Sequence, residues 1–199
     1  MNDTTHASPR SRWLYLGLAV AFFVLYTANL YRQAGLQPTL IVSGSMVGGM
    51  IGWLATTWRR PAEPRLIVPI YLTTMALFFV HVLEEYLFDF AGRISALFEL
   101  TWPETDFVTT IMLLGPIIWL GATIGLLRRN PFANFIAWFI LFGMVLGEPA
   151  HLVFPLVAGG DYHYFPGMWT ALMPMVTAIL GLAVIIGDHR AAVRRGEVA

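Results

Sequence analysis

Long apolar segments separated by short polar ones make up most of the chain. A bilayer core about 30 Å thick is crossed by roughly 20 apolar residues in helical form, and lipid leaves a spanning backbone few alternatives to a helix. Six segments meet this requirement and are predicted as membrane helices, at residues 13–30, 38–58, 66–90, 107–127, 131–157 and 166–187. The sequence therefore predicts an all-α polytopic membrane bundle with a polar N-terminal tail (1–12), one six-helix domain (13–187) and a C-terminal tail (188–199).

Composition and charge agree with this pattern. Of the 199 residues, 57% are hydrophobic and 12% are charged, whereas soluble domains carry about 25% charged residues. Ten of the twelve arginines lie in the two tails and in the loops after the second and fourth spans. Because positively charged loops stay on the cytoplasmic side, we expect both termini in the cytoplasm. No phosphate-binding loop or basic surface pattern is present, and no nucleic-acid partner is expected.

The second span contains a repeated spacing of small residues. Gly44, Gly48 and Gly52 recur every four residues, with Ser45 and Gly49 beside them. Small residues at this spacing allow two helix backbones to approach closely in lipid. We expect this face to pack against another helix.

The third span contains ionisable residues at membrane depth, where they are costly and mark functional sites. His81, Glu84 and Glu85 are spaced i, i+3 and i+4, so they point to one side of a helix. No Arg or Lys in the segment neutralises the carboxylates. A hydrogen bond to a neighbouring helix would explain one histidine, but one imidazole beside two carboxylates favours a functional site.

A second polar pair lies in the fifth span. Glu148 and His151 are spaced i and i+3 and share a face, and Pro149 between them predicts a kink. At about 1.5 Å per residue, His81 and Glu148 both lie roughly 22–24 Å from the cytoplasmic ends of their spans. The two pairs therefore share a depth in the outer half of the bilayer. His163, in the loop that follows on the same side, is a further candidate ligand.

Three of these motifs together resemble a known family. The segment His81-Val82-Leu83-Glu84-Glu85, a later histidine and Tyr164-Phe165-Pro166-Gly167 are similar to the bacterial membrane proteins named for their HXXEE motif. The resemblance leaves open whether His151 or His163 is the second histidine. It implies a multi-pass protein of the bacterial inner membrane and a site at these residues. Because the family has no assigned activity, it implies no reaction.

Imidazole and carboxylate groups without cysteine suit zinc, iron or manganese, and zinc is favoured here. A catalytic zinc needs three protein ligands and an open position. The expected metal ligands are His81, Glu85, His151 and His163, and the candidate general bases are Glu84 and Glu148.

The reaction expected from this set is metal-dependent hydrolysis of a lipid-like or amphiphilic substrate. Three alternatives stay open at this point: a metal-free acid/base isomerase acting on a lipid-like substrate, a di-iron oxidoreductase, and a metal or proton transporter.

Overall fold

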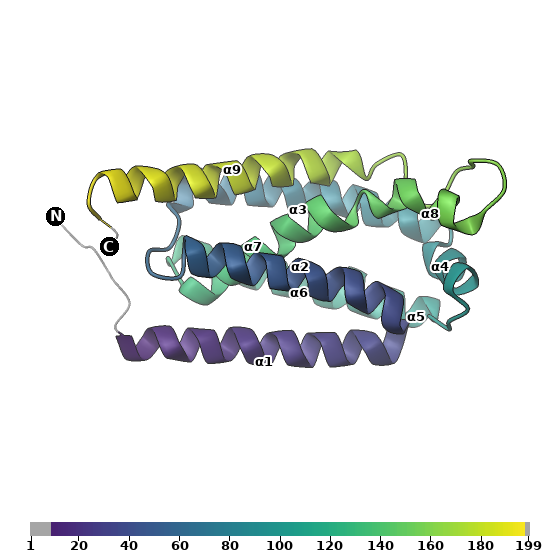
Figure 1. Ribbon diagram of the computed structural model, residues 1–199, viewed down its shortest axis with the longest axis horizontal. Coiled ribbons are helices and arrows are strands. Elements are labelled where there is room, and N and C mark those ends of the chain that lie inside the picture. Colours follow the sequence, from purple (N-terminus) through teal and green to yellow (C-terminus); the bar gives the residue numbers. More distant parts are fainter. Residues whose placement is uncertain (1–8, 198–199) are drawn as a thin grey trace.

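The computed structural model describes residues 9–197 and shows a bundle of helices (Figure 1). The helical elements are α1 (Pro9–Ala34), α2 (Leu36–Ala55), α3 (Pro64–Leu87), α4 (Phe90–Phe98), α5 (Glu104–Phe107), the π-helical segment η1 (Val108–Leu114), α6 (Gly115–Leu127), α7 (Pro131–Gly147), α8 (Ala150–Ala158) and α9 (Leu172–Arg194). No strand occurs in the described part of the chain. The all-α fold predicted from hydropathy is confirmed.

Six of the helical stretches are long and apolar enough to cross a membrane, as predicted. They are Arg12–Ala34, Leu36–Ala55, Pro64–Leu87, Glu104–Leu127, Pro131–Ala158 and Leu172–Arg194. Large apolar side chains also cover the outside of the bundle, as in Leu25, Leu87 and Leu120. A surface of this kind suits contact with lipid.

Both ends of the described chain lie at the same end of the bundle. The start of α1 and the end of α9 are both on the left of Figure 1. Arginines of this end form ion pairs, among them Arg60 with Asp188 at 2.9 Å and Arg129 with Glu63 at 2.5 Å. We refer to it as the arginine-rich end. Its location in the cytoplasm stays a prediction.

Several predicted boundaries differ from the structure. Residues 1–8 of the predicted N-terminal tail lie outside the described residues, but α1 already begins at Pro9, and α9 continues through the predicted C-terminal tail to Arg194. The third span ends at Leu87, and the predicted connection contains α4, whose start is capped by the Asp89 side chain. The sixth span begins at Leu172 instead of Pro166.

The small residues of α2 pack against α7, as predicted. The backbone of Phe139 in α7 lies so close to Gly49 that an added Cβ would be 2.6 Å from the Phe139 Cα atom and 2.7 Å from its nitrogen. Gly48 and Gly52 lie against the side-chain rings of Phe142 and Trp138. This contact holds α7 near the centre of the bundle, and α7 leads into the polar site.

Replacing Gly49 with Ala is expected to lower the free energy of unfolding by about 1–3 kcal/mol, because the α2 and α7 backbones must separate to admit the methyl group. Thermal unfolding in detergent measures this. Gly121→Ala is the matched control, since its added Cβ meets no atom within 4 Å. Equal melting temperatures for the two variants would show that the close approach is not required.

Candidate functional site

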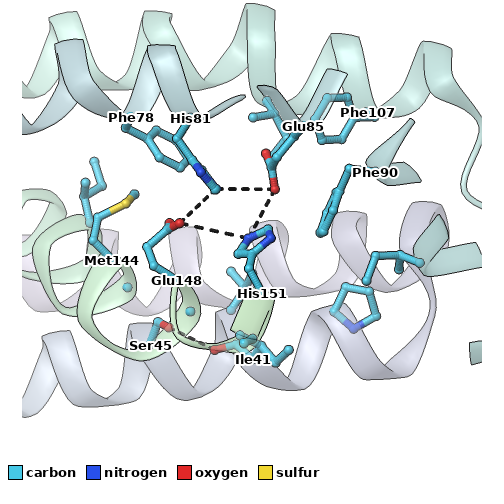
Figure 2. A pocket seen from close by; sticks show the side chains of 18 of the residues that line it. Ile41, Ser45, Phe78, His81, Glu85, Phe90, Phe107, Met144, Glu148 and His151 are labelled. Carbon is cyan, nitrogen blue, oxygen red and sulfur yellow. Dashed lines mark hydrogen bonds and ion pairs between the residues drawn. The ribbon is translucent and has the colours of Figure 1, made fainter. Parts of the chain in front are cut away.

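Four ionisable side chains meet inside the half of the bundle away from the arginine-rich end. His81 and Glu85 come from α3, Glu148 follows the end of α7, and His151 lies in α8. All four are buried, with exposed fractions of 1%, 6%, 6% and 5%. They point toward one another in Figure 2. We refer to these four residues as the polar cluster.

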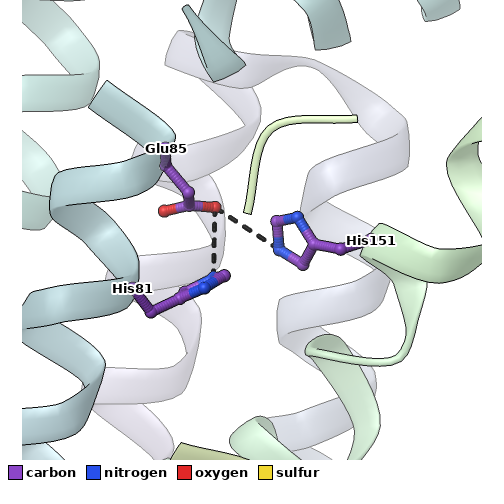
Figure 3. A group of neighbouring side chains, drawn as sticks. All are labelled: His81, Glu85 and His151. Carbon is purple, nitrogen blue, oxygen red and sulfur yellow. Dashed lines mark ion pairs between the residues drawn. The ribbon is translucent and has the colours of Figure 1, made fainter. Parts of the chain in front are cut away.

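The distances within the polar cluster are short. His81 Nε2 lies 2.8 Å from Glu148 Oε2 and 3.6 Å from Glu85 Oε1. His151 Nε2 lies 3.4 Å from the same Glu85 oxygen and 4.0 Å from Glu148 Oε2. One ligand atom from each of His81, Glu85 and His151 lies within 4.8 Å of the others (Figure 3). These three side chains are arranged as metal ligands would be.

A break in the fifth span brings the two pairs together. α7 ends at Gly147 and α8 begins at Ala150, with Pro149 between them. Proline has no backbone N–H and disrupts the helical hydrogen-bond pattern. The predicted kink is confirmed, and it sets His151 opposite α3.

Each histidine of the polar cluster has a hydrogen-bond partner outside the cluster, and this partner determines which ring nitrogen bears hydrogen. The Thr170 hydroxyl donates to Glu84 Oε2 at 2.5 Å, so its oxygen is left to accept a hydrogen bond from His81 Nδ1 at 3.1 Å. His151 Nδ1 lies 2.7 Å from the Pro166 carbonyl, which only accepts. Both Nδ1 atoms therefore bear hydrogen, and both Nε2 atoms face the carboxylates of the polar cluster.

Glu84 does not belong to the polar cluster, contrary to the expectation that it serves there as a base. It points toward the chain before α9 and accepts four hydrogen bonds there. The donors are the Tyr164 hydroxyl, the backbone N–H groups of Trp169 and Thr170, and the Thr170 hydroxyl, at 2.5–3.2 Å. Burial and the adjacent Glu84 carboxylate raise the pKa of Tyr164 above its ordinary value. Glu84 therefore anchors the loop that holds both histidines.

His163 also lies outside the polar cluster, so the structure does not support it as a ligand. It is exposed, and its Nδ1 atom lies 2.9 Å from the Asp161 carbonyl in its own loop. Of the two histidines that the sequence left open, His151 is the one that faces His81 and Glu85. The loop enters the site through the Pro166 carbonyl and Gly167 instead.

An apolar cavity of about 220 Å³ adjoins the polar cluster. Aromatic rings surround its polar wall: the Phe78 ring lies 5.9 Å from the His81 ring, and the Phe90 ring lies 5.0 Å from the His151 ring. Aliphatic residues from α2, α4 and α7 complete the lining. Phe78, Phe90 and Thr170 were not predicted from the sequence. The spacing of Phe78 one turn before His81 is a signal that could have indicated the first of them.

Comparisons with known proteins give partial matches. No protein-family model matches the chain, and no solved structure matches it. The chain is 34% identical over 89 residues to protoheme IX farnesyltransferase 1 of Pseudomonas fluorescens, a match that covers 41% of this chain and 29% of that protein. It is 36% identical over 72 residues to protoheme IX farnesyltransferase of Azotobacter vinelandii, covering 35% and 23%. The chain spans less than a third of the length of these curated relatives.

These relatives contradict the hydrolase that the site chemistry led us to expect. They are named as transferases of a farnesyl group, and no hydrolase is among them. The expectation failed because imidazole and carboxylate groups at membrane depth define a polar site without defining the bond that changes there.

Proposed function

We propose that this chain binds an isoprenoid-type amphiphile within the membrane and acts in prenyl transfer. The observation that supports the proposal is the apolar cavity that ends at the buried polar cluster. The farnesyltransferase names of its partial relatives favour an isoprenoid chain over other apolar groups. The geometry suits a ligand with an apolar chain and one polar end.

The cavity provides the contacts that an isoprenoid chain requires. Aromatic and branched side chains line it, and burial of apolar surface contributes roughly 25 cal/mol per Å². Cavities of this kind bind mainly through apolar contact and orient the ligand through a few polar groups. Here those polar groups are the imidazoles and carboxylates of the polar cluster, which fix the end of the molecule that reacts.

Glu148 is the group placed to move a proton. In prenyl transfer the bond between the prenyl C1 atom and the leaving oxygen breaks, and that oxygen departs with the electron pair. A bond forms from C1 to the acceptor, which gives up a proton. The Glu148 side chain lines the cavity, and its Oε2 atom lies 2.8 Å from His81 Nε2. Its carboxylate takes this proton as a general base.

Filling the cavity is expected to block binding of the chain. Gly147 lines the cavity, and a Cβ added there meets only Ile41, at 3.9 Å. We expect Gly147→Leu to lower labelling by a photoreactive farnesyl probe at least tenfold, a change of about 1.4 kcal/mol in binding. Gly121→Leu is the matched control, because Gly121 is exposed and its added Cβ meets no neighbour.

Equal labelling of wild type and Gly147→Leu would contradict the assignment of the cavity. The transfer step is tested separately, with labelled farnesyl diphosphate and protoheme IX added to the protein in proteoliposomes. Wild type is expected to yield farnesylated product and Glu148→Gln to yield none. A wild type that binds the probe but gives no product would contradict prenyl transfer.

A further inference from the structure

The polar cluster holds two carboxylates and two imidazoles close together. The outer hydrogen bonds use the Nδ1 atoms of His81 and His151, so both Nε2 atoms face the carboxylates of Glu85 and Glu148. No Arg or Lys is among the described residues that line the adjoining cavity. Glu85 and Glu148 are each 6% exposed, so two buried carboxylates share the two imidazoles, and Glu148 Oε2 lies 2.8 Å from His81 Nε2. Burying negative charge in this way is costly unless a cation compensates it.

We infer that His81 Nε2, Glu85 Oε1 and His151 Nε2 bind one divalent transition-metal ion, with zinc preferred. The distances support this: ligand atoms about 2.0–2.2 Å from a tetrahedral zinc lie roughly 3.3–3.5 Å apart, and Glu85 Oε1 lies 3.6 Å and 3.4 Å from the two Nε2 atoms. Two imidazoles and a carboxylate suit zinc, manganese or iron better than magnesium, which prefers oxygen ligands. Three protein ligands leave one position open, and Glu148 Oε2 lies 2.8 Å and 4.0 Å from the two ligand nitrogens.

The hydrogen bonds outside the ligands match those of protein metal sites. A histidine that binds a metal usually donates its other N–H to a carbonyl or a carboxylate, which fixes the ring. His151 does so directly to the Pro166 carbonyl. His81 does so through Thr170, whose hydroxyl in turn donates to Glu84. Thr170 and Glu84 are therefore positioning residues for the His81 ligand.

A second cavity, of about 150 Å³, lies next to the first and shares Glu85, Phe90 and Phe107 with it. Its lining adds Asp89 and Glu104, and no basic side chain is among its described lining residues. A cavity with this charge attracts cations and repels anions. Glu85, the carboxylate between the two histidines, belongs to the lining of both cavities, so a cation held in the second cavity lies next to a ligand of the proposed site.

The test is metal binding by the full chain, purified in detergent, stripped with a chelator and titrated with zinc or cobalt without any isoprenoid. We expect one ion per chain, with cobalt giving visible absorption bands. Glu85→Gln and His151→Ala are expected to weaken binding at least 100-fold. Thr170→Val is expected to weaken it 10- to 100-fold, as outer-shell changes do. His163→Ala is the control and should bind as wild type does.

Failure of wild type to bind any of zinc, cobalt, manganese or iron stoichiometrically would overturn the inference, as would equal loss of binding in His163→Ala. Should His151→Ala unfold, Glu85→Gln, which has nearly the same shape, decides the question. The farnesyl probe is tested on the stripped protein as well, so failure of metal binding and failure of isoprenoid binding are seen separately.

Discussion

Glu84→Gln is expected to lower the free energy of unfolding by about 3 kcal/mol, because buried hydrogen bonds to a charged group contribute roughly 1.5–3 kcal/mol each. The two carboxylate oxygens of Glu84 each accept two hydrogen bonds from the chain before α9. A glutamine has one oxygen, so its amide N–H₂ would face two donors. Denaturation of the purified protein in mixed micelles measures the change.

The matched control is the same substitution at Glu148, in the same region of the bundle. The Oε2 atom of Glu148 lies 2.8 Å from His81 Nε2, and a glutamine there keeps one oxygen that can face this nitrogen. Glu84→Gln disturbs four hydrogen bonds, whereas Glu148→Gln disturbs fewer. In the metal-free protein, Glu148→Gln is therefore expected to lose less stability than Glu84→Gln does. A loss of stability in Glu148→Gln equal to that in Glu84→Gln would refute the distinct roles of the two carboxylates.

Gly167→Ala is expected to weaken metal binding at least 100-fold and to lower stability. The φ angle of Gly167 is +90°, a value that residues with a Cβ rarely adopt. Its added Cβ would lie 2.4 Å from His151 Nδ1 and 2.8 Å from His81 Cε1. Both rings would have to move, and His151 would lose its hydrogen bond to the Pro166 carbonyl. Metal titration and thermal unfolding measure the two effects.

Gly160→Ala tests the effect of a positive φ angle separately from the steric clash with the two histidines. Gly160 lies in the same loop with φ +79°, and a Cβ added there meets no atom within 4 Å. It has a similar conformational cost, about 1–2 kcal/mol, without displacing a ligand. We expect Gly160→Ala to bind metal as wild type does. Equal loss of metal in both variants would mean that loop strain, and not contact with the histidines, determines the site.

The spans and the meeting of the two polar pairs could be predicted from sequence because both depend on local properties. A run of about 20 apolar residues identifies a span whatever helices surround it, and the helical rise per residue gives the position of a residue along its span. The kink followed from Pro149 alone. α4 was not predicted, because its nine residues are too few for a clear apolar period and its start depends on the Asp89 side chain.

The spacing of Glu84 and Glu85 alone could not show which neighbouring helix each side chain faces. At about 100° per residue, Glu84 and Glu85 lie on either side of the direction of His81, one about 60° and the other about 40° away. Which of them faces α8 and which faces α9 depends on how the helices are arranged. The start of the sixth span was missed for a similar reason, since Glu84 binds the N–H groups of Trp169 and Thr170 and holds residues 166–170 outside α9.

The central claim is that His81, Glu85 and His151 form one site for a single ion. X-ray absorption at the metal edge of the zinc-loaded protein tests this most directly. The structure predicts nitrogen and oxygen ligands at about 2.0–2.2 Å, with the scattering pattern of two imidazoles and loss of one imidazole in His151→Ala. A spectrum without imidazole scattering, or one that His151→Ala leaves unchanged, would contradict the claim.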